Sequence, residues 1–129
     1  MEPGAETLYA YANRRRREIT EGVNGGSGRI VPVTIAAGTF PFPIDATTRN
    51  AIASAATATT LAGGDAYTVP SWLLPTGRFI TLDATAIVVV ALAISVAFQA
   101  VFSAQAAAFA GIADGSVTTH EAVDAILGS

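Results

Sequence analysis

The sequence lacks several of the residue types on which protein chemistry depends. Its 129 residues include no cysteine, and all seven positive charges are arginines, so lysine is absent as well. Without cysteine there is no disulfide, no thiol nucleophile and no cysteine-ligated metal. His120 is the one histidine, so any Ser-His-Asp arrangement would have to be built around it. These absences predict that the protein is not an enzyme and that it holds neither a metal ion nor a cofactor.

Charge is scarce along the chain. Charged residues make up 13% of the sequence and hydrophobic residues 51%, and the net charge is −3. Charged residues usually make up about 25% of a globular protein. A surface this poor in charge suggests that other chains cover part of it. The negative balance argues against a nucleic-acid partner. The length suits one domain, and we expect a flexible lead-in over residues 1–5 followed by a single α+β domain over residues 6–129.

Helices and β-hairpins are predicted to alternate. Asp45 is placed to cap one helix, and Asp83 or Thr81 to cap another. Thr118 and Glu121 have the spacing of a capping box, and residues 24–28 are expected to form a flexible turn. The expected helices cover residues 6–21, 46–61, 84–113 and 118–127, and the expected strand segments cover 30–35, 39–44, 67–74 and 78–81.

The pattern predicts an α+β fold in which a small antiparallel sheet of two hairpins packs against an alanine-rich helical bundle with one long helix. Prolines at 32, 41 and 43 cannot donate backbone hydrogen bonds, so they favour edge strands. Large apolar side chains of the hairpins and of the long helix are expected in the core or at an interface. They are Phe40, Phe42, Trp72, Phe79, Ile80, Ile87, Ile94, Phe98, Val101 and Phe102.

Residues 84–113 carry no charge. A helix of that length spans roughly 45 Å, which exceeds the ~30 Å hydrocarbon core of a bilayer, so a membrane span is an open alternative. Residues 87–94 are apolar all round, which predicts burial among other helices. Ser95, Gln99 and Ser103 follow at intervals of four and form a polar stripe typical of a half-exposed face. No Arg or Lys follows Arg78, so the positive-inside signal is missing.

Two groups of polar residues are candidates for function. Glu121 and Asp124 lie near His120, but two carboxylates three residues apart are more typical of a solvated helix face than of a metal site, which recruits more His or Cys. The run Arg14, Arg15, Arg16 and Arg17 is the one concentration of charge. Consecutive residues point around a full helical turn, so we interpret the run as solubilising its helix or as pairing with carboxylates of a neighbouring subunit.

The order of these pieces resembles an uncharacterised phage domain family, a domain of unknown function encoded among tail and tail-fibre genes. The resemblance runs roughly from residue 9 to residue 127. Its most specific part is a tryptophan hairpin that leads through Leu-Asp-Ala into an alanine-rich helix. A proline-rich PFP stands here where the family tends to have a plain strand. The matching segments are YANRRRREITEGV, FPFPIDATTRNAIASAATA, VPSWLLPTGRFITLDA and VAFQAVFSAQAAAFAGI.

The resemblance implies a non-enzymatic bacteriophage structural protein of the tail, baseplate or tail-fibre attachment. It would act through subunit packing with other virion proteins, as a homo-oligomer in a symmetric assembly. It would be found in the phage particle, and in the host cytoplasm during assembly. Two alternatives stay open: a tail-fibre assembly chaperone absent from the mature virion, and a small holin-like membrane protein. The resemblance favours a soluble protein over a membrane protein.

Overall fold

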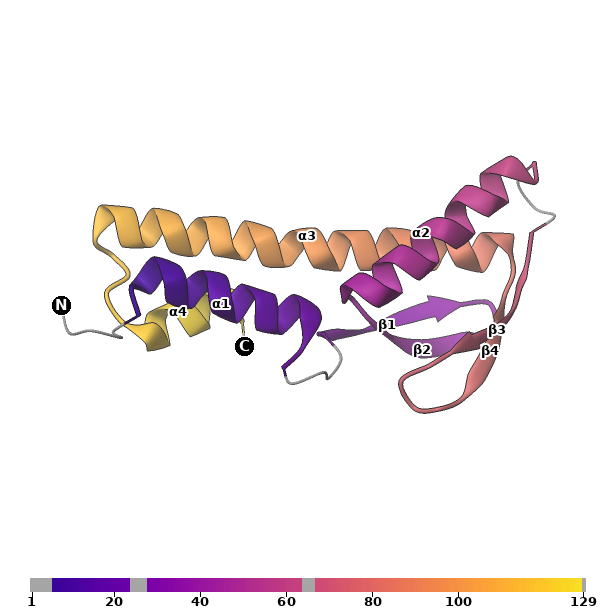
Figure 1. Ribbon diagram of the computed structural model, residues 1–129, viewed down its shortest axis with the longest axis horizontal. Coiled ribbons are helices and arrows are strands. Elements are labelled where there is room, and N and C mark those ends of the chain that lie inside the picture. The colour runs from indigo at the N-terminus through magenta and orange to yellow at the C-terminus, as the bar shows by residue number, and fades with distance from the viewer. Residues whose placement is uncertain (1–5, 24–27, 64–66, 129) are drawn as a thin grey trace.

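The computed structural model describes residues 6–23, 28–63 and 67–128. The lead-in expected over residues 1–5 and most of the turn expected over residues 24–28 lie outside the described residues. Along the described chain the fold is α+β, as predicted, with helices and hairpins in alternation (Figure 1). The elements are α1 (Leu8–Glu21), β1 (Ile30–Ile35), β2 (Gly38–Pro43), α2 (Ala46–Leu61), β3 (Val69–Leu73), β4 (Phe79–Leu82), α3 (Ala84–Asp114) and α4 (His120–Leu127).

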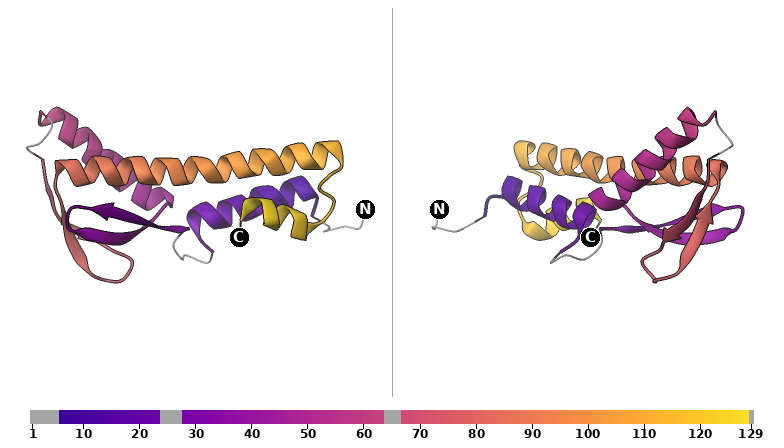
Figure 2. Two further views of the ribbon diagram at one scale, coloured as in Figure 1. Left: turned by 180° about the vertical axis from the view of Figure 1, so that it is seen from behind. Right: turned by 45° about the vertical axis from the view of Figure 1, so that its right-hand side comes forward.

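The long helix α3 is the spine of an elongated molecule. It contacts the other three described helices and both hairpins. Figure 1 and Figure 2 show α1 and α4 along its C-terminal half, while α2 crosses its N-terminal half and the hairpins lie beside that same half. Segments from opposite ends of the sequence, α1 and α4, therefore pack together against one helix.

The hairpins form two separate two-stranded antiparallel sheets rather than one sheet of four strands. In the first hairpin Pro32 of β1 faces Pro41 of β2. Neither proline has an amide hydrogen, and Pro43 ends the same strand, so this hairpin offers few donors for a further strand. The second hairpin has an irregular register between Val69 and Trp72. The edge character predicted from the prolines therefore holds for strands β1 and β2.

Short side chains fix where the helices begin. Asp45 accepts a hydrogen bond from a backbone amide of α2, as predicted, and Asp83 rather than Thr81 does the same for α3. At α4 the predicted capping box is wrong by one residue. Thr119 is the N-cap and accepts from the amide of Ala122 at 3.1 Å, so the helix begins at His120.

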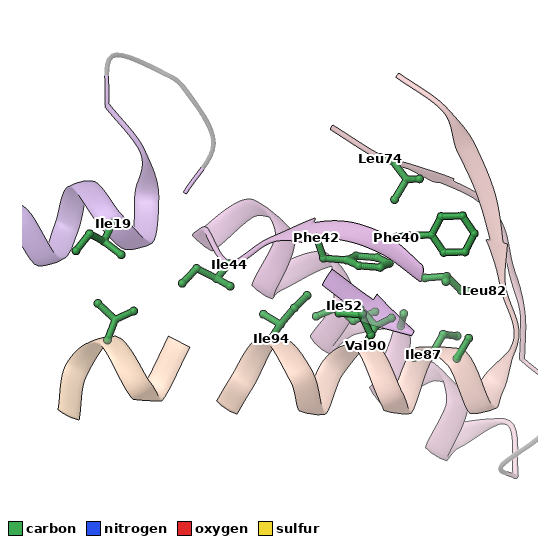
Figure 3. Close-up of a cluster of buried hydrophobic side chains, with 14 of the residues drawn as sticks. Ile19, Phe40, Phe42, Ile44, Ile52, Leu74, Leu82, Ile87, Val90 and Ile94 are labelled. Carbon is green, nitrogen blue, oxygen red and sulfur yellow. The ribbon is translucent and has the colours of Figure 1, made fainter. Parts of the chain in front are cut away.

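The core runs along the inner side of α3 and includes buried residues of the other described helices and of both hairpins; Figure 3 shows the part beside the first hairpin. Phe42 and Ile44 are fully buried there, and Val90 and Ile94 of α3 lie across from them. Six of the ten large residues expected in the core or at an interface are buried, two are half-buried, and Phe79 and Phe102 are exposed. The buried ones are Phe40, Phe42, Ile80, Ile87, Ile94 and Val101, and the half-buried ones are Trp72 and Phe98.

Phe79, one of the residues expected in the core or at an interface, does not lie in the core. Its side chain is 61% exposed. Successive side chains of a strand point to opposite faces, and β4 buries Ile80 and Leu82, so Phe79 and Thr81 point outward. Leu74, which follows β3, is buried instead at 3% exposure.

Candidate functional site

One side of α3 is left uncovered by the rest of the fold. Val88, Leu92 and Val96 are 54%, 65% and 62% exposed. They stand at intervals of four residues and therefore share one helix face. The expectation that residues 87–94 are buried all round is thus wrong, because the hairpins and the other described helices occupy only part of the circumference of α3.

The same face continues to the C-terminal end of α3. Ser95, Gln99 and Ser103 are exposed, as the predicted polar stripe requires, and the turns beyond them expose alanines. No charged residue occurs from Ala84 to Ala113. The helix therefore presents an uncovered face roughly 45 Å long that is apolar at its N-terminal end, neutral and polar at its centre, and lined by small residues at its far end.

The opposite side of α3 receives the basic helix α1. The Arg16 Nε donates to the Gln105 Oε1 at 3.0 Å, and Gln105 donates to Asn13 of α1 at 3.2 Å. The Arg16 guanidinium also lies 4.5 Å from the centre of the Phe102 ring. Burial of this guanidinium lowers the pKa of Arg16. Arg16 thus fastens α1 to the long helix within one chain.

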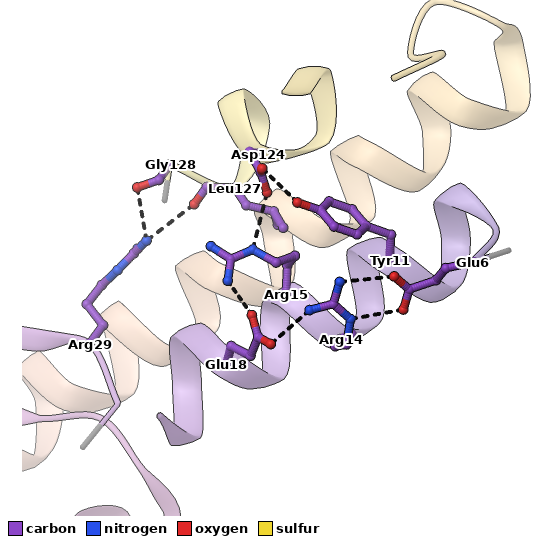
Figure 4. A network of polar contacts seen from close by, with 9 residues as sticks. All are labelled: Glu6, Tyr11, Arg14, Arg15, Glu18, Arg29, Asp124, Leu127 and Gly128. Carbon is purple, nitrogen blue, oxygen red and sulfur yellow. Dashed lines mark hydrogen bonds and ion pairs between the residues drawn. The ribbon is translucent and has the colours of Figure 1, made fainter. Parts of the chain in front are cut away.

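Arg14 and Arg15 also find carboxylates within the chain (Figure 4). Arg14 pairs with both oxygens of Glu6 at 3.0 Å and with Glu18 at 2.9 Å. Arg15 pairs with Glu18 and with Asp124 of α4. The hydrogen bond from Arg15, joined by that from Arg14, holds the pKa of Glu18 below its usual range.

These pairs change the interpretation of the arginine run. The run was expected to solubilise its helix or to pair with carboxylates of a neighbouring subunit, and Arg14, Arg15 and Arg16 have partners within the chain, on α1, α3 and α4. Arg17 is exposed, and among the described residues no ion pair joins it. Intersubunit contacts of the run stay a prediction. The sequence alone could not identify Asp124 as a partner of Arg15, because only the packing of α4 on α1 brings the two side chains together.

The polar residues of α4 are likewise used to join helices. The Tyr11 hydroxyl donates to the Asp124 Oδ2 at 2.7 Å, and this bond raises the pKa of Tyr11. The Tyr11 ring stacks on the His120 ring, with centroids 3.9 Å apart and planes at 4°. Within the described residues no group of three His, Asp or Glu side chains is gathered as metal ligands. Sequence reasoning missed Tyr11, and no local signal marks it.

Two hollows lie beside α3. One lies next to the turn of the first hairpin, and its acidic residue, Asp83, is engaged as the N-cap of α3. The other lies between α2 and α3 and includes Arg49. That guanidinium is bonded to Glu21 at 2.9 Å and lies 3.8 Å from the Phe98 ring centre. The charged groups at both hollows are therefore already engaged within the protein, and the uncovered face of α3 is the better candidate site.

A family model described as "Domain of unknown function (DUF4376)" matches residues 4–127. The chain belongs to this family. The DUF4376 match extends over every described helix and strand, so the whole fold is the family's domain. No curated protein and no solved structure matches the chain.

Proposed function

We propose that this protein is a non-enzymatic structural component of a bacteriophage particle, in the tail, the baseplate or the tail-fibre attachment, and that it works by packing against other subunits. The uncovered face of α3 carries this proposal. Val88, Leu92 and Val96 are each more than half exposed on a face without charge. Contiguous apolar patches of this kind mark sites that another molecule covers.

The phage part of the proposal draws its support from the order of the sequence segments. The basic first helix, the Asp45-capped helix, the tryptophan hairpin and the alanine-rich helix occur in the order of the phage family they resemble. The DUF4376 match covers the same stretch of chain.

The membrane alternative has one observation in its favour. By length and composition α3 could cross a bilayer, and only 28% of its most apolar window is buried. Against this, Arg49 lies over the Phe98 ring and Arg16 lies over the Phe102 ring, near the middle of α3. In this fold a membrane-spanning α3 would bring both guanidinium groups into hydrocarbon, which is costly. The arrangement therefore favours a protein partner over lipid.

Mass spectrometry of purified particles tests the proposal. In a phage or induced prophage that carries this gene, we expect the protein in the particles at a fixed ratio to known tail proteins. Presence in the lysate but absence from the particles would overturn the proposal in favour of the assembly chaperone. Recovery only in detergent-extracted membranes would favour the membrane protein.

A matched pair of variants connects particle membership to the α3 face. Leu92→Glu places a charge on that face, and Phe79→Glu places the same charge on the second hairpin, at a side chain that is 61% exposed against 65% for Leu92. We expect Leu92→Glu to reduce incorporation into particles and Phe79→Glu to leave it unchanged. Equal incorporation of both would remove the α3 face from the proposal.

A further inference from the structure

The exposed side of α3 follows a seven-residue repeat. Residues at alternating intervals of four and three run along the whole helix, and every one is exposed. We call this set the α3 seam, and it consists of Thr85, Val89, Leu92, Val96, Gln99, Ser103, Ala106, Ala110 and Ala113. Figure 2 shows that α1, α4 and the hairpins leave this long helix open on one side. An apolar repeat of this period is the pattern by which one helix packs along another in a coiled coil.

The seam is bulky at one end and small at the other. Its N-terminal half carries Val89, Leu92 and Val96, and its C-terminal half carries the three alanines. Two parallel copies would place bulky residues against each other and alanine against alanine, which leaves the second half loosely packed. Two antiparallel copies place each bulky residue against a small one, so the contact is filled evenly along its length.

We infer that α3 pairs with α3 of a second copy of this chain, as an antiparallel two-stranded coiled coil along the α3 seam. In the best register Leu92 lies opposite Ala110, Val96 opposite Ala106 and Val89 opposite Ala113 of the second copy. The inference rests on the proposed function in one respect only, that the α3 face is where subunits pack.

The centre of the seam sets this register. In it Gln99 lies opposite Ser103 of the second copy, so an amide faces a hydroxyl and each can hydrogen-bond the other. A slip of one heptad would place Gln99 opposite Val96 and Leu92 opposite Ser103, which buries polar groups without partners and costs free energy. A polar residue within a coiled-coil interface fixes register in this way. The absence of charge along the seam means that no like charges meet.

The accessible surface of the chain is large enough for an interface with a second copy. The accessible surface of the chain is 7208 Å², about 800 Å² more than the ~6,400 Å² expected for a compact monomer of 13.1 kDa. A standard protein interface removes about 800 Å² from each partner. The chain therefore exposes more surface than a compact monomer of its mass, by about the area that one such interface removes from each partner.

Cysteine cross-linking tests the pairing directly, because the chain has no cysteine of its own. Leu92→Cys and Ala110→Cys are made as separate variants, and each is treated alone and mixed with the other, under oxidation or with a short dithiol cross-linker. We expect the mixture to give a covalent heterodimer and each variant alone to stay uncross-linked. Cross-linking of Leu92→Cys alone would overturn the antiparallel arrangement.

Analytical ultracentrifugation tests the dimer without any cross-link. We expect wild-type protein to be dimeric at ~100 μM, and Leu92→Glu to raise the dissociation constant by about 100-fold or more, since a charge would be buried at a central contact. Phe79→Glu is the matched control and should dimerise like wild type. Thermal unfolding of both variants checks that they fold. A wild-type monomer at that concentration would overturn the inference, as would a monomer that binds phosphatidylcholine–phosphatidylglycerol vesicles.

The two proposals fail separately. A dimer of the predicted register that is absent from purified particles would contradict the proposed function and leave the pairing intact. A protein that is present in particles but monomeric and uncross-linked would contradict the pairing and leave the function intact.

Discussion

The Tyr11 hydroxyl donates a hydrogen bond of 2.7 Å to the Asp124 carboxylate, across 113 residues of sequence. The second oxygen of the same carboxylate accepts from the Arg15 Nε at 3.3 Å. Both oxygens of one α4 side chain are therefore held by α1. Because α4 is a short helix, and isolated helices of this length are marginal in water, this contact and the buried Val123 and Leu127 hold it in place.

Removing the Tyr11 hydroxyl should weaken the α1–α4 contact. Tyr11→Phe is expected to lower the free energy of unfolding by about 1 kcal/mol, the usual net worth of a partly exposed hydrogen bond to a charged group. Chemical denaturation measures this, and Tyr9→Phe, on the same helix and packed edge-on against Phe109, is the control expected to be near neutral. A double-mutant cycle with Asp124→Ala, which removes the acceptor, should show coupling. Additive effects would contradict the contact.

Two phenylalanines of the hairpins should differ sharply in their contribution to stability. Phe42 is 0% exposed and Phe79 is 61% exposed. Phe42→Ala should cost about 3–5 kcal/mol of unfolding free energy because it leaves a cavity against α3. Phe79→Ala should change stability by about 0.5 kcal/mol or less, as surface substitutions do. Denaturant midpoints measure both, and equal losses would show that the strand faces are assigned wrongly.

Gly28 is required by a close approach of two backbones. A Cβ added there would lie 1.9 Å from the carbonyl oxygen of Thr20, and the next residue, Arg29, donates its amide to the Ile19 carbonyl at 2.7 Å. Gly28→Ala must push β1 away from the end of α1, so we expect a loss of about 2 kcal/mol or more. Gly77→Ala, whose Cβ meets nothing within 4 Å, should cost only its left-handed backbone strain of about 1 kcal/mol. Equal melting temperatures for the two variants would contradict the close approach.

Acid should loosen α1 through its carboxylates. The hydrogen bond from Arg15 holds the pKa of Glu18 below its usual value of 4.5, and Arg14 does the same for Glu6. The folded state therefore binds protons at Glu18 and Glu6 less readily than the unfolded state does. Their stabilising effect is complete above the unfolded pKa and is lost as the pH falls through the folded pKa.

Thermal melts between roughly pH 6 and pH 3 measure this effect. The wild-type midpoint should fall on acidification, and Glu18→Gln should flatten the fall because it removes one of the titrating pairs. Glu121→Gln is a control on an exposed carboxylate of α4 and should track the wild type. Parallel curves for wild type and Glu18→Gln would show that this pair adds no pH-dependent stability.

What the sequence predicted correctly is local. Asp45 and Asp83 cap α2 and α3 because a capping side chain acts on amides two or three residues away. The exposed stripe of Ser95, Gln99 and Ser103 follows from helical spacing alone. The predicted N-cap of α4 was wrong by one residue, because the side chains of Thr118 and Thr119 can both accept a hydrogen bond from a helix amide. Which of the two does so depends on the path of the chain after α3.

What the sequence did not predict depends on neighbours far along the chain. Arg15 meets Asp124 only because α4 folds back on α1. The N-terminal half of α3 is apolar all round, and a sequence cannot show how much of a helix circumference other elements will cover. Phe79 and Ile80 are adjacent large apolar residues, so the face that β4 buries is set by its pairing with β3 and its packing on α3.

The position of α1 also has a consequence for the order in which the protein is made. Its partners are α3 and α4, and Arg29, just beyond it, donates to the carbonyls of Leu127 and Gly128. At about 5–20 residues per second, a ribosome reaches α4 roughly 5–20 s after α1. Until α3 is made, α1 has neither of its docking partners, and it lacks α4 for the whole interval, although each hairpin can already close on itself. The last helix to be translated therefore completes the packing of the first.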